Sequence, residues 1–136
     1  MVAAVSRAQA TRVTDLCIRL SILVAAIVNI VPVVGLLSRK HVARGYDVRL
    51  EDPNLVVLMR HRALLFGLLG SFLAYAAFVP ALHGLAFAGG LVSMLGFGAL
   101  GLAERDRLSR RMWKLLGADL IATAVLLLGL ALHWAR

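Results

Sequence analysis

Four long apolar stretches constrain this chain more than any other feature of its sequence. They cover residues 16–37, 58–79, 82–103 and 112–134. Each has about the 20 residues that an α-helix needs to cross the roughly 30 Å hydrocarbon core of a bilayer. Open strands leave backbone groups without hydrogen bonds in lipid, so helices are the favoured way to span it. The sequence therefore predicts an all-α integral membrane protein, with residues 1–136 forming a single transmembrane domain.

The composition supports a membrane environment and excludes several other classes. Of the 136 residues, 61% are hydrophobic and 16% are charged, whereas soluble domains have about 45–50% apolar and about 25% charged residues. The mean hydropathy of +0.87 agrees. A single cysteine excludes an intramolecular disulfide framework. No ligand spacing typical of a metal site is present, and we expect neither a metal nor a cofactor.

The connections between the apolar stretches predict the topology. Only Pro80 and Ala81 separate the second stretch from the third, so those two helices must be antiparallel neighbours. Asp52 followed by Pro53 is typical of a helix N-terminus, with an N-cap and a proline at the first helical position. We expect a four-helix bundle with antiparallel up-down topology, loops at about 38–53 and 104–111, and a short polar or surface-lying lead over residues 1–14.

The basic residues predict the orientation of the bundle. Eleven of the 15 lysines and arginines flank the first and third loops, and basic residues favour the cytoplasmic side. We therefore expect both longer loops in the cytoplasm and both termini outside. The net charge of +8 is explained by this topology and by anionic lipid headgroups, so membrane lipids are the expected partners and nucleic acid is not.

Glycine motifs in the spans indicate helix packing. Residues 96–101 match the G-x-G-x-x-G pattern, but no strand precedes them, and they lie inside a span where a dinucleotide has no access. Small residues at four-residue spacing, such as Ala63, Gly67 and Ser71 on the second span and Gly89 and Ser93 on the third, allow helices to approach closely.

Two histidines are predicted near the outer membrane face. His83 and His133 alone are too few ligands for a typical zinc site. Because His133 is followed by Trp134, we interpret this end of the fourth span as an interfacial anchor.

Polar residues at membrane depth provide the strongest functional signal. Asp119 lies about 10 Å into the fourth span, where an acid needs a partner, a proton or a polar cavity. Asn29 and residues 60–62 are expected at the same depth on other helices. Arg60 shares a helical face with Ala63 and the small residues that follow it, so we predict that Arg60, rather than His61 or Arg62, points into the bundle.

Two interpretations of this cluster stay open. In the first, an Arg60–Asp119 ion pair supported by Asn29 only locks the bundle. In the second, the cluster forms a pocket toward the inner leaflet, in which Asp119 or His61 moves a proton and Arg60 holds an anionic oxygen. The ligand-binding residues of that pocket would be Asn29, Arg62, Tyr46, Ser93 and Thr123.

Residues 36–70 contain an Asp-Pro-Asn-Leu segment and an Arg-His-Arg segment, and residues 118–120 are Ala-Asp-Leu. In these segments the chain resembles small bacterial four-helix membrane proteins related to the DoxX-like group. The resemblance covers most of the chain. It implies the bacterial inner membrane and an association with respiratory or redox complexes. The wider fold group is similar to membrane sterol isomerases, but fold alone does not transfer chemistry. Some relatives are labelled phosphopantetheine adenylyltransferase, an activity that no nucleotide-binding motif in this chain supports.

We therefore predict a protein that binds a lipophilic small molecule near the cytoplasmic leaflet. If the ligand reacts, acid-base isomerisation or cyclisation is the expected chemistry, because the sequence contains no motif for nucleophilic or metal-assisted hydrolysis. The alternative is a non-catalytic accessory subunit, whose small-residue faces pack in a homo-oligomer or a larger membrane complex.

Overall fold

In the computed structural model, which describes residues 2–33 and 52–135, the chain forms an all-α four-helix bundle, as predicted. The helices are α1 (Val2–Ile30), α4 (Pro53–Ala76), α5 (His83–Ala103) and α6 (Arg110–Trp134). Short 3-10 turns are η1 (Val31–Val33), η2 (Pro80–Leu82) and η3 (Arg105–Arg107). The described ranges contain no strand. All four helices are long and apolar enough to span a membrane, so the chain is a multi-pass membrane protein.

Local capping chemistry determines where α4 and α6 begin. The Asp52 side chain accepts a hydrogen bond from the backbone N–H of Asn54 at 2.8 Å, and proline occupies the first turn of α4. At α6, the Ser109 hydroxyl accepts from the backbone N–H of Met112 at 3.2 Å. Both caps satisfy N–H groups that have no partner within the helix. The cap predicted at Asp52 is confirmed, and it places the start of α4 before residue 58.

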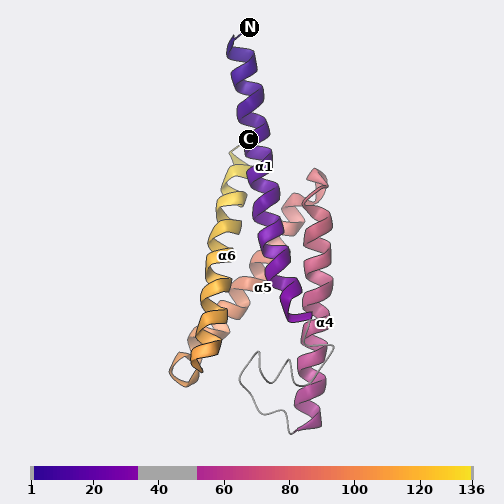
Figure 1. The fold of residues 1–136 in the computed structure, drawn as a ribbon, viewed down its shortest axis with the longest axis vertical. Coiled ribbons are helices and arrows are strands. Elements are labelled where there is room, and N and C mark those ends of the chain that lie inside the picture. Colours follow the sequence, from indigo (N-terminus) through magenta and orange to yellow (C-terminus); the bar gives the residue numbers. More distant parts are fainter. Residues whose placement is uncertain (1, 34–51, 136) are drawn as a thin grey trace.

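The helices alternate in direction (Figure 1). α1 lies between α4 and α6 and packs most extensively against these two helices, while α5 crosses behind them and packs mainly against α6. Helices α4 and α5 share a much smaller contact, although only η2 and a short turn connect them. A cavity remains between α4, α5, α6 and the end of α1.

The first helix is longer than the predicted span. α1 begins at Val2 and includes the segment expected to be a separate lead. Its N-terminal end projects beyond the C-terminal end of α6 (Figure 1). No glycine or proline interrupts the sequence between Val2 and Ile30, so nothing in it breaks the helix.

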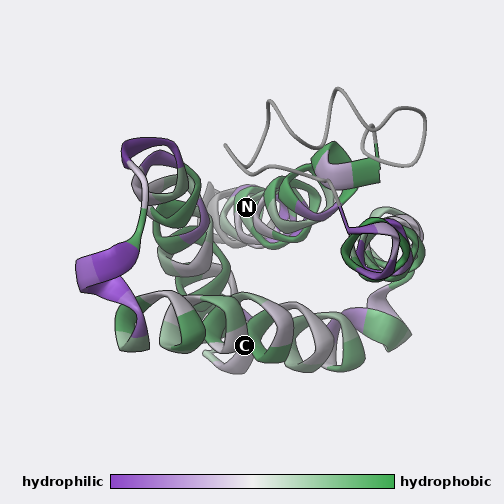
Figure 2. Ribbon diagram, turned by 90° about the horizontal axis from the view of Figure 1, so that it is seen from below, coloured by the Kyte–Doolittle hydropathy of each residue, from purple (hydrophilic) through white to green (hydrophobic). Residues whose placement is uncertain are grey.

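The outer surface of the bundle is apolar. Large exposed side chains include Val92 with 76% exposure, Ile121 with 70% and Leu128 with 67%. Viewed from below, hydrophobic colour runs along the helices, and hydrophilic colour gathers at the turn between α5 and α6 (Figure 2). Apolar surface of this extent is typical of a lipid-facing protein and rare on soluble monomers.

Small residues bring the helix backbones together in the core. A Cβ atom at Gly70 of α4 would lie 2.9 Å from the carbonyl oxygen of Ala26 on α1, and one at Gly129 of α6 would overlap the Ser21 side chain. In the glycine-rich segment of α5, a Cβ atom at Gly101 would lie 2.8 Å from Leu116. Small residues at such interfaces are the usual means of close packing between membrane helices.

Candidate functional site

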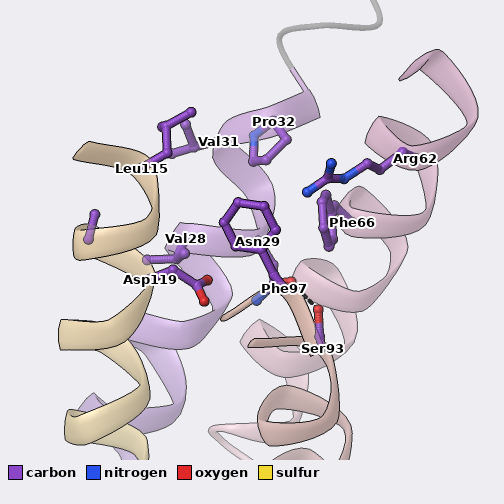
Figure 3. A pocket seen from close by; sticks show the side chains of 11 residues that line it. Val28, Asn29, Val31, Pro32, Arg62, Phe66, Ser93, Phe97, Leu115 and Asp119 are labelled. Atoms are coloured by element: carbon purple, nitrogen blue, oxygen red, sulfur yellow. Dashed lines mark hydrogen bonds between the residues drawn. The ribbon is translucent and has the colours of Figure 1, made fainter. Parts of the chain in front are cut away.

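A cavity of about 170 Å³ lies between η1, the end of α1 and parts of α4, α5 and α6 (Figure 3). It lies where α1 ends and α6 begins, at the end of the bundle predicted to face the cytoplasm. The lining residues are Val28, Asn29, Val31, Pro32, Arg62, Phe66, Ser93, Phe97, Leu115, Ala118 and Asp119. Most of this lining is apolar, and four polar side chains interrupt it.

Asp119 is the acid of the cavity. It lies on α6 with only 7% of its surface exposed, and its side chain points toward the cavity (Figure 3). Its Oδ2 atom is buried and has no hydrogen-bond partner among the residues that the structure describes. A buried polar atom without a partner costs about 1–3 kcal/mol, and more when it is charged. A polar group that forms a hydrogen bond with Oδ2 would therefore stabilise buried Asp119.

Asn29 and Ser93 form a polar contact between α1 and α5. Asn29 is 3% exposed. Its Nδ2 donates to the backbone carbonyl of Ala25 at 2.8 Å, and its Oδ1 accepts from the Ser93 hydroxyl at 3.2 Å. The hydrogen bond is drawn as a dashed line in Figure 3. These two bonds fix the orientation of the amide at the edge of the cavity.

Arg62 is the cation of the cavity. Its guanidinium lies 5.0 Å from the centroid of the Phe66 ring on the same helix and 5.0 Å from that of Phe97 on α5. Both distances are within the range of cation–π attraction. Arg62 and Asp119 line the same cavity from α4 and α6, and their charges attract each other.

The prediction that Arg60 points into the bundle is wrong. Arg60 is exposed, and Arg62 lines the cavity instead. The small-residue face that includes Ala63 and Gly67 packs against η1, which directly follows α1, since a Cβ atom at Gly67 would meet Val33 at 2.9 Å. The cavity lies beside this contact, on the side of Arg62. Of the two arginines, Arg62 is therefore the one placed to meet Asp119.

Three other predicted site residues lie elsewhere. His61 is exposed and does not line the cavity. Thr123 is 4% exposed, but its hydroxyl donates to the backbone carbonyl of Asp119 at 2.8 Å and does not reach the cavity lining. Tyr46 lies outside the described residues. Of the predicted set, the structure brings Asn29, Arg62, Ser93 and Asp119 together.

Phe66 and Phe97 are functional candidates that the sequence reasoning missed. The spacing of four residues between Arg62 and Phe66 indicates a contact on one helical face. Phe97 comes from a different helix, and no signal in the sequence pairs it with Arg62. The aromatic contacts of the guanidinium therefore required the tertiary structure.

Two histidines, His83 and His133, lie close together at the opposite end of the bundle. The rings of His83 and His133 lie edge to face with centroids 5.8 Å apart, and Phe87 contacts His133 at 5.7 Å. His83 is only 1% exposed, so it is a core residue. Within residues 2–33 and 52–135, no three His, Cys, Asp or Glu side chains gather in a metal-binding arrangement.

The chemistry available at the cavity follows from its four polar groups. Asp119 can exchange a proton or a hydrogen bond, and Arg62 can donate hydrogen bonds to an oxygen. Most of the lining is apolar, and electrostatic interactions are stronger in apolar surroundings than in water. Comparison of the chain with models of known protein families, with curated proteins and with solved structures finds no match.

Proposed function

We propose that this multi-pass membrane protein binds a lipophilic small molecule in the cavity lined by Asn29, Arg62, Ser93 and Asp119. The observation that carries the proposal is the Oδ2 atom of Asp119, which is buried at the cavity without a hydrogen-bond partner. Ionisable residues inside membrane spans are costly and usually mark a functional site. A bound molecule with a polar group would form the hydrogen bond that this carboxyl oxygen lacks.

The size and walls of the cavity agree with such a ligand. An apolar cavity of about 150 Å³ is large enough to hold benzene, so 170 Å³ accommodates one ring or the end of a longer molecule. Val28, Pro32 and Leu115 provide apolar contact. Because the helices around the cavity are embedded in lipid, a lipophilic molecule reaches them from the bilayer.

The proposal extends to acid-base chemistry on the bound molecule. Asp119 would take a proton from one carbon of the ligand and return it to another, as an isomerase or cyclase requires. Arg62, held between two phenyl rings, would stabilise the negative charge that develops on a neighbouring oxygen. His61 has no part in this mechanism, because it is exposed outside the cavity.

The proposed setting is the bacterial inner membrane, with both termini outside and a relation to the DoxX-like group. Basic residues lie at 60–62, near the start of α4, and at 105–114, between the end of α5 and the start of α6. Both groups are at the same end of the bundle. Because basic residues favour the cytoplasmic side, this end is proposed to face the cytoplasm.

A non-catalytic accessory role is the second candidate. Cβ atoms at Gly84, Gly96 and Gly117 would meet nothing within 4 Å, so the outer faces of α5 and α6 offer close approach to another helix. A second copy of the chain or another subunit of a membrane complex would use these positions. Native mass spectrometry distinguishes this candidate, because it would show a stable assembly without a small-molecule adduct.

Ligand-dependent thermal stabilisation tests the main proposal. The purified protein is heated in detergent with and without a lipid extract of the host membrane, beside a Val28→Phe variant whose larger side chain fills the cavity. We expect the extract to raise the melting temperature of the wild type and to have little effect on Val28→Phe. Equal shifts for both proteins would contradict ligand binding in the cavity.

A further inference from the structure

The charges on the cavity walls restrict the class of molecule that it can bind. Arg62 carries a positive charge on one side, and Asp119 is the acid on the other. A cationic ligand is attracted by Asp119 but repelled by Arg62, and an anionic ligand is attracted by Arg62 but repelled by Asp119, so neither gains a net attraction. The cost of an uncompensated charge is large in a site of low dielectric constant. The walls together favour a ligand without net charge.

The unmet hydrogen bond at Asp119 restricts the ligand further. The ligand must bring a polar hydrogen or an equivalent group to Oδ2, because no described residue supplies one. A hydroxyl group fits a carboxylate oxygen, because it can donate a hydrogen bond to it. An ether or a hydrocarbon cannot donate a hydrogen bond and would leave the carboxylate oxygen without a partner.

The aromatic side chains around Arg62 indicate a flat ligand. Phe66 and Phe97 each lie 5.0 Å from the guanidinium carbon and also line the cavity. Aromatic rings pack favourably against other rings in offset or edge-to-face geometry. The volume of about 170 Å³ limits the enclosed part to about one six-membered ring.

We propose that the cavity recognises an uncharged six-membered ring with a hydroxyl group, a phenol or a similar ring alcohol, which donates its hydrogen bond to Asp119. A second oxygen on the ring, where the ligand has one, accepts from Arg62. Any apolar tail extends from the cavity into lipid. This inference rests on the proposed function and names the chemical class of its ligand.

A series of four single-ring probes tests the inference. Phenol carries the hydroxyl, anisole replaces its hydrogen with a methyl group, benzoate is an anion and benzylamine is a cation. Binding is measured by isothermal titration calorimetry in matched detergent micelles. The Val28→Phe protein gives the reference for partitioning into the micelle. We expect phenol to bind at least about tenfold more tightly than each of the other three, as a hydrogen bond to a charged group implies.

Two variants connect this preference to Asp119. Asp119→Leu removes the acceptor while keeping the number and branching of the side-chain heavy atoms, and it should abolish the preference for phenol over anisole. Asp119→Asn retains an acceptor oxygen and should preserve part of it. The comparison of phenol with anisole on the wild type needs no variant, so it stands even if a substitution prevents folding.

The outcomes separate the class of ligand from the existence of a binding site. If all four probes bind equally to the wild type and are lost in Val28→Phe, the cavity binds small molecules but the hydroxyl inference is wrong. If no probe binds the wild type more tightly than Val28→Phe, the proposed function fails and the inference fails with it.

Discussion

The guanidinium of Arg62 on α4 lies 5.0 Å from the ring centroid of Phe97 on α5. Helices α4 and α5 have little other contact compared with the extensive packing of α1 against α4. Beside the cavity, a cation and an aromatic ring therefore connect two helices that pack less extensively against each other. The same contact places a positive charge on the cavity wall and fixes the side chain that would face a ligand.

Replacing Arg62 with methionine should destabilise the bundle. Each cation–π contact contributes about 0.5–2 kcal/mol, so the loss of two contacts should reduce the free energy of unfolding by about 1–4 kcal/mol. Arg60→Met is the matched control, because Arg60 is two residues away and exposed; its effect should stay within about 0.5 kcal/mol. Unfolding by SDS in mixed micelles, followed by circular dichroism, measures both. Equal losses for the two variants would contradict the assignment of Arg62 to the cavity.

Gly70 should not tolerate a side chain. Its missing Cβ atom would lie 2.9 Å from the backbone carbonyl oxygen of Ala26, so Gly70→Ala forces α4 and α1 apart and should cost about 1–3 kcal/mol of unfolding free energy. Gly96→Ala is the control, since a Cβ atom there meets nothing within 4 Å. The control should be neutral or slightly stabilising because alanine favours helix. Thermal unfolding in detergent separates the two, and similar melting temperatures would contradict close packing of α1 and α4.

The sequence was sufficient to predict the fold because the bilayer leaves few alternatives. Spans of about 20 apolar residues must be helical, and the short Pro80-Ala81 connection requires antiparallel neighbours. The N-cap at Asp52 was also predictable, because its cause is local. The extension of α1 to Val2 was not predicted, since hydropathy identifies the membrane-spanning part of a helix and not its solvent-exposed continuation.

The depth of a residue along its helix could be predicted from the sequence. The rotation of each helix about its own axis, which decides which residues face the cavity, could not. Asn29 and Asp119 were expected in the same leaflet, and both line the cavity. The choice of Arg60 over Arg62 failed because the small-residue face of α4 packs against α1, whereas the cavity lies beside that contact. A helical wheel identifies a face but not which neighbour that face meets. Phe97 was missed for the same reason.

The hydrogen bond between Ser93 and Asn29 should be measurable as a coupling energy. Their side chains connect α5 and α1 at 3.2 Å. A double-mutant cycle with Asn29→Ala and Ser93→Ala should give a coupling of about 0.6 kcal/mol, the average for such bonds in membrane proteins. SDS unfolding supplies the four free energies. A coupling near zero would mean that the two residues do not interact.

The predicted orientation can be checked with fusions at opposite ends of α6. Alkaline phosphatase folds only outside the cytoplasm, whereas green fluorescent protein exported in an unfolded state stays dark. A phosphatase fused after Arg136 should be active, and one fused after Asp106 should be inactive. The fluorescent protein should give the reverse pattern. An inactive phosphatase at Arg136 with an active one at Asp106 would place both termini in the cytoplasm.

Native mass spectrometry of the protein purified from its host membrane in a mild detergent tests the central claim most directly. We expect the wild type to retain a small-molecule adduct that is absent from Val28→Phe, in which the cavity is filled, and reduced in Asp119→Leu, in which the buried carboxyl is removed. Solvent extraction of the adduct then identifies the ligand. If the wild type carries no adduct, even after incubation with membrane extract, or if all three proteins carry the same adduct, the cavity is not a ligand-binding site.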